Sequence, residues 1–69
     1  MKTTIVKYPD VHVQLSGEDG NAFAIIGRVT KALKRAGHKD AATEFANEAM
    51  RQPSYDHLLR LAMKTVDVA

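Results

Sequence analysis

The sequence contains no cysteine and no tryptophan among its 69 residues, and only two prolines. Without thiols the chain forms no disulfide, no thiolate zinc site and no cysteine nucleophile. No apolar run reaches the length of about 18 residues that a membrane-spanning helix needs. The first residues also lack a secretory signal pattern. We therefore expect a cytoplasmic protein with no membrane partner.

Large apolar residues are also few. Ten of the 31 apolar residues are alanine, which leaves 21 larger ones for the core. So short a chain buries only about 60% of the surface of its unfolded form, and dense helix packing or oligomerisation is the usual compensation. We therefore expect one domain over residues 1–69 and a homodimer. The net charge of +2 is too small to indicate nucleic-acid binding by itself.

The N-terminal part, residues 2–15, is rich in β-branched residues and is predicted to be extended. Apolar and polar residues alternate at its end, which is the period of a half-buried strand. A two-residue loop at Pro9 and Asp10 would make a hairpin in which Tyr8 faces Val11. Proline disfavours such a turn, because it cannot adopt the positive φ that tight hairpins need. A single strand and a hairpin therefore both remain open.

The rest of the chain predicts helices over residues 21–36, 39–51 and 54–66, because apolar residues recur there at three and four positions. Gly37 suits the end of the first helix, and Ser54 suits the start of the third. The tail, residues 67–69, is expected to fray. The fold class is therefore α+β: an N-terminal strand or hairpin followed by three helices. The predicted core consists of Val13, Phe23, Ile26, Val29, Leu33, Phe45, Leu58, Leu59 and Ala62.

A basic stripe follows the first predicted helix. Arg28, Lys31 and Arg35 are spaced so that they share a narrow arc, and Lys34 and Lys39 flank them. Such a stripe is able to contact phosphates, and it predicts nucleic-acid or anion binding as one alternative. No aromatic residue interleaves with the basic ones to stack on bases, so a solvated helix face is the simpler interpretation.

Polar residues gather at two predicted helix starts. Asp19 and Asn21 lie at the first, and Tyr55, Asp56 and His57 lie at the third. Free backbone amides at helix starts attract anions, so the two sets would form a polar surface patch if the fold brought them together. Helix capping explains the same residues more simply.

Residue types suited to catalysis or metal binding are scattered along the chain. The candidates are His12, His38, His57, Glu44 and Glu48, which would ligate a metal only if the fold gathered them. They show no HExxH-like spacing, and neighbouring residues such as Asp56 and His57 point about 100° apart on a helix. We therefore expect no enzyme, no cofactor and no metal.

Four segments of the chain form a combination that is fairly specific: SGEDGNAF at residues 16–23, ALKRAG at 32–37, YDHLL at 55–59 and the ending VDV at 66–68. Together they resemble a family of small hypothetical proteins of bacteria and their phages. The resemblance extends over most of the chain from Val11 onward. It implies a complete small protein of phage or prophage origin and carries over no catalytic, cofactor or binding residue. The sequence thus favours a non-enzymatic interaction or accessory protein, with nucleic-acid binding as the alternative.

Overall fold

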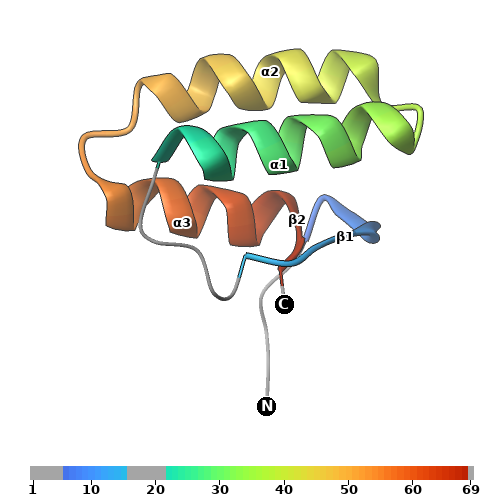
Figure 1. Ribbon diagram of the computed structural model, residues 1–69, viewed down its shortest axis with the longest axis horizontal. Coiled ribbons are helices and arrows are strands. Elements are labelled where there is room, and N and C mark those ends of the chain that lie inside the picture. Colours follow the sequence, from blue (N-terminus) through green and yellow to red (C-terminus); the bar gives the residue numbers. More distant parts are fainter. Residues whose placement is uncertain (1–5, 16–21, 69) are drawn as a thin grey trace.

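The computed structural model describes residues 6–15 and 22–68. Two strands and three helices follow in the order β1 (Tyr8–Val13), α1 (Ala22–Arg35), α2 (Lys39–Met50), α3 (Tyr55–Thr65) and β2 (Val66–Val68). Figure 1 shows α1 lying between α2 and α3, with β1 and β2 beside the end of α3. The predicted α+β class and its three helices are confirmed, and each helix bound lies within one residue of its prediction.

The two strands form a parallel pair that joins the beginning of the described chain to its end. Tyr8 is paired with Val66 and Val13 with Val68, and the ladder is irregular between Tyr8 and His12. Pro9 lies inside this irregular stretch, and it has no backbone N–H to donate to a ladder.

The hairpin alternative with a turn at Pro9 and Asp10 is wrong, because both residues lie within β1. The partner strand comes from the C-terminal end instead, where β2 begins at the fully buried Val66. The predicted fraying of residues 67–69 is also wrong for Asp67 and Val68, which belong to β2. Residues 2–5 of the predicted extended segment, and Ala69, lie outside the described residues.

One hydrophobic core connects the helices and the sheet. Its fully buried centre includes Ile25, Val29 and Leu33, which recur at four-residue intervals along α1. The predicted core residues Val13, Phe45, Leu58 and Ala62 are also buried, and Ile26 and Leu59 are partly buried against the core.

The prediction that Phe23 belongs to the core is wrong, because its side chain is 74% exposed. At about 100° per residue, Phe23 lies roughly 160° around the helix from Ile25. Ile25 therefore takes the buried position, and Phe23 faces away from it.

The turn between α1 and α2 lies at Gly37, where the sequence predicts the end of the first helix. Gly37 ends α1 with a φ of 89°, and the N–H of His38 donates to the carbonyl oxygen of Leu33 at 2.8 Å. The Gly37 N–H donates to the oxygen of Lys34 at 3.0 Å, which completes a Schellman motif. This turn reverses the chain, so that α1 and α2 run side by side in opposite directions (Figure 1).

Candidate binding surfaces

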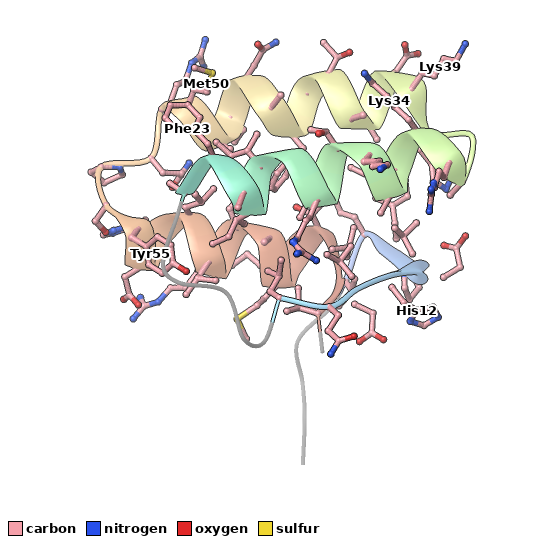
Figure 2. All side chains as sticks on the ribbon, viewed as in Figure 1. His12, Phe23, Lys34, Lys39, Met50 and Tyr55 are labelled. Atoms are coloured by element: carbon pink, nitrogen blue, oxygen red, sulfur yellow. The ribbon has the colours of Figure 1, made fainter. Side chains whose placement is uncertain are left out.

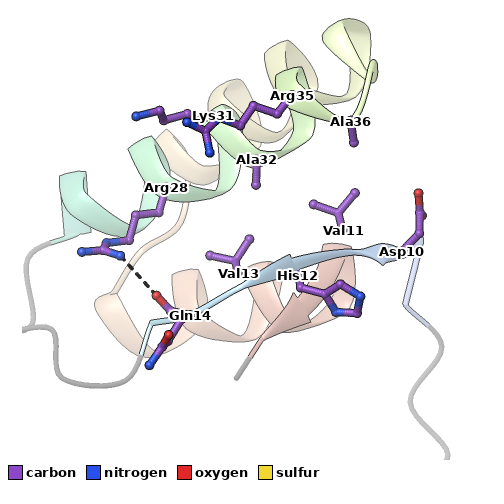
Figure 3. A pocket seen from close by; sticks show the side chains of 10 residues that line it. All are labelled: Asp10, Val11, His12, Val13, Gln14, Arg28, Lys31, Ala32, Arg35 and Ala36. Carbon is purple, nitrogen blue, oxygen red and sulfur yellow. Dashed lines mark hydrogen bonds between the residues drawn. The ribbon is translucent and has the colours of Figure 1, made fainter.

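A groove of about 710 Å³ lies between β1 and α1, and we call it the basic groove. One wall is formed by the consecutive residues 10–14. The other wall is formed by two turns of α1 and the residue that follows it, and its lining residues are Arg28, Lys31, Ala32, Arg35 and Ala36. Figure 3 shows both walls, with Gln14 and Arg28 at one end and Asp10 and Ala36 at the other.

The basic side chains of the groove differ in whether they already contact another part of the protein. A guanidinium N–H of Arg28 donates to the backbone oxygen of Gln14 at 3.4 Å, which ties α1 to the end of the strand (Figure 3). Lys31 and Arg35 are exposed, and no ion pair among the described residues includes either of them. Asp10 supplies one negative charge at the far end. The groove therefore presents two cations that are available to a ligand.

The predicted basic stripe divides into two parts in the fold. The spacing of Arg28, Lys31 and Arg35 places them within an arc of about 60°, and all three line the basic groove. Lys34 lies in the last turn of α1 and Lys39 at the start of α2, and neither lines the groove. Both lie near the turn that joins the two helices (Figure 2).

A second surface lies at the opposite end of the helices, and we call it the apolar groove. Phe23, Met50 and Tyr55 border this hollow of about 390 Å³, and their exposed fractions are 74%, 70% and 37%. Figure 2 shows the three side chains at one end of the helix layer. Because α2 runs opposite to α1 and α3, this end collects the start of α1, the end of α2 and the start of α3. The remaining lining residues are Ala22, Ile26, Ala49, Gln52, Ser54 and Leu58.

The polar residues at the start of α3 are engaged locally. The backbone N–H of His57 donates to Oγ of Ser54 at 3.2 Å, and a second hydrogen bond of 2.6 Å joins that Oγ to Nδ1 of the His57 ring. Asp56 lies 3.3 Å from Arg60 one helical turn later. Capping and a helix-surface ion pair thus account for these side chains. Asp19 and Asn21, the other half of the predicted polar patch, lie outside the described residues.

The three histidines lie apart and have different neighbours. His12 contacts Asp67, and His57 belongs to the α3 cap. His38 packs its ring 4.6 Å from that of Tyr8, and its buried Nε2 lies 3.9 Å from a carboxylate oxygen of Asp10. Within residues 6–15 and 22–68, no group of three or more histidine or acidic side chains is placed to hold a metal ion. No described helix is long and apolar enough to span a membrane.

Sequence reasoning missed two features of these surfaces. It did not place residues 10–14 opposite the basic stripe, because the approach of a strand to a helix is not encoded locally. It also did not predict that the side chains of Phe23 and Met50 are exposed to solvent. The four-residue spacing of Ile25, Val29 and Leu33 was a readable signal for Phe23, because that spacing defines a buried stripe on the other side of the helix.

No protein-family model, curated protein or solved structure matches this chain. The resemblance to small bacterial and phage proteins therefore stays a prediction. The geometry of the two grooves is the basis for a functional proposal.

Proposed function

We propose that this chain is a small non-enzymatic interaction protein that forms a homodimer through the apolar groove. The observation that carries the proposal is the clustering of Phe23 and Met50, both at least 70% exposed, around one hollow. Single exposed apolar side chains are common on proteins, whereas contiguous apolar surface is typical of binding sites.

A second copy is the partner that fits this surface best. The apolar groove combines a hollow with protruding apolar side chains at its border, so the surface is complementary to itself. A twofold axis would insert Phe23 and Met50 of each copy into the groove of the other, as isologous interfaces require. Burying one such side chain contributes about 1.5–3 kcal/mol, and the added apolar contacts would enlarge the small core of a 69-residue chain.

Sedimentation velocity at a series of concentrations tests this proposal. We expect the wild-type chain to dimerise and Phe23→Glu to be a monomer, because the substitution places a charge in the buried interface. Met63→Glu is the matched control, because Met63 is 53% exposed but does not line the apolar groove. A wild-type monomer at high micromolar concentration would overturn the proposal, as would equal dissociation by both substitutions.

Nucleic-acid binding through the basic groove is the second candidate, favoured by the uncommitted charges of Lys31 and Arg35. It requires affinity that falls steeply with salt, because cation release dominates phosphate binding. Asp10 and the lack of a Phe, Tyr or Trp side chain in the groove lining argue against it. An electrophoretic mobility assay at low salt, compared with Arg35→Glu, tests it.

We place this interaction protein in the cytoplasm of a bacterial or phage-infected cell. The support is the lack of cysteine, which suits a reducing compartment, and the resemblance of the four sequence segments described above.

A further inference from the structure

One edge of β1 pairs with no described strand, and the basic groove lies beside β1. β1 pairs with β2 on one edge, and no other described strand pairs with β1. The groove is lined by the consecutive residues 10–14 and by no residue of β2, so it follows the strand on the side away from β2. An unpaired strand edge offers N–H donors and C=O acceptors to another extended chain.

We propose that the basic groove binds an extended acidic segment of a partner protein, which adds as a strand beside β1. The partner's backbone pairs with the edge of β1, and its acidic side chains pair with Lys31 and Arg35 on α1. This surface is separate from the apolar groove, so the proposal does not depend on the homodimer.

The spacing of the two walls matches an extended chain. Lys31 and Arg35 are four residues apart, which is about 6 Å along a helix. Alternate residues of a strand are about 6.6 Å apart and point to the same side. Acidic residues at positions i and i+2 of the bound segment would therefore each reach one cation. Residues 10–13 of β1 and the following Gln14 provide about 16 Å of backbone in the opposite wall, enough for a segment of about five residues.

The mixed chemistry of the groove favours a peptide over a nucleic acid. A phosphate backbone only accepts hydrogen bonds. It would therefore pair with the N–H donors of the strand edge and leave the C=O acceptors without a partner. A peptide strand satisfies both kinds of group, which is the basis of recognition by strand addition. Asp10 would repel a phosphate at one end of the groove, whereas a five-residue acidic segment need not extend its charges that far.

A nuclear magnetic resonance titration of the full ¹⁵N-labelled chain tests the proposal. The probe is the acetylated and amidated peptide Thr-Glu-Thr-Glu-Thr. We expect chemical-shift changes along residues 10–14 and on the groove side of α1. Lys31→Glu and Arg35→Glu should weaken binding about tenfold or more, because each replaces attraction by repulsion. Lys34→Glu is the matched control, since it makes the same charge change on α1 outside the groove and should leave binding nearly unchanged.

Backbone methylation of the probe separates strand addition from simple charge attraction. Two variant peptides have the same charges as the probe. One carries methyl groups on the backbone nitrogens of its threonines, and the other carries them on the backbone nitrogens of its glutamates. Only one of these sets points its N–H groups at β1, so one methylated peptide should lose binding while the other keeps it. Equal binding of both would overturn the proposal. Tighter binding of a thymidine oligonucleotide to the same residues would favour nucleic acid instead, and an absence of shifts at millimolar peptide would also overturn the proposal.

Discussion

Nδ1 of the His12 ring lies 2.7 Å from a carboxylate oxygen of Asp67, and this contact links β1 to β2 across 55 residues of chain. The ring N–H donates to the carboxylate, which only accepts when ionised. Both side chains are exposed, at 72% and 57%. Water therefore competes with the contact, and the buried Val13 and Val66 of the same strands contribute more to their pairing.

The substitution His12→Ala should lower the free energy of unfolding by no more than about 1 kcal/mol, as is usual for an exposed pair. Val66→Ala should lower it more, because Val66 is fully buried and its truncation leaves a cavity. Urea denaturation followed by circular dichroism compares the two variants. If His12→Ala proved the more harmful, the pair and not the buried valine would hold the strands together.

The substitution Leu33→Ala should lower the free energy of unfolding by about 2–5 kcal/mol, because it creates a cavity at a fully buried position. Phe23→Ala should cost less than about 1 kcal/mol in the monomer, because its ring is mostly exposed. Chemical denaturation at a protein concentration at which sedimentation velocity shows a monomer measures both. Equal losses would mean that Phe23 belongs to the core after all.

The two described glycines should respond to alanine in opposite ways. Gly27 lies inside α1 with nothing within 4 Å of an added Cβ, so Gly27→Ala should stabilise the protein by about 0.5–1 kcal/mol. Gly37 has a φ of 89°, so Gly37→Ala should destabilise it by about 1 kcal/mol or more through backbone strain. Thermal melts of the two variants serve as each other's control. A stabilising effect of Gly37→Ala would contradict the assignment of the α1 C-cap, and a destabilising effect of Gly27→Ala would contradict the open space at Gly27.

Removing the cap of α3 should weaken that helix. Ser54→Ala deletes the oxygen that accepts from His57 N–H, and it should lower the free energy of unfolding by about 1 kcal/mol. Ser54→Asp retains an acceptor at the N-cap and should restore most of the loss. Amide hydrogen exchange in the first turn of α3 reports the local effect. Unchanged exchange in Ser54→Ala would show that the cap contributes nothing to the helix start.

Local sequence signals determined the helices of this protein. The three- and four-residue recurrence of apolar side chains located all three helices to within one residue, and Gly37 and Ser54 marked two of their ends. These features depend on residues close together in the chain, so they are readable without the fold. The same helical spacing also placed Arg28, Lys31 and Arg35 on one side of α1.

Only the tertiary structure decided what lies opposite those side chains. The pairing of β1 with β2, the exposure of Phe23 and the approach of residues 10–14 to α1 all depend on contacts between distant parts of the chain. The sequence of a strand shows which of its faces is apolar. Its partner strand is not readable from that sequence, because it is the segment that packs against the same core in the folded chain. Here the buried Val66 brings the C-terminal strand against β1, and the helix and the strand then enclose the basic groove.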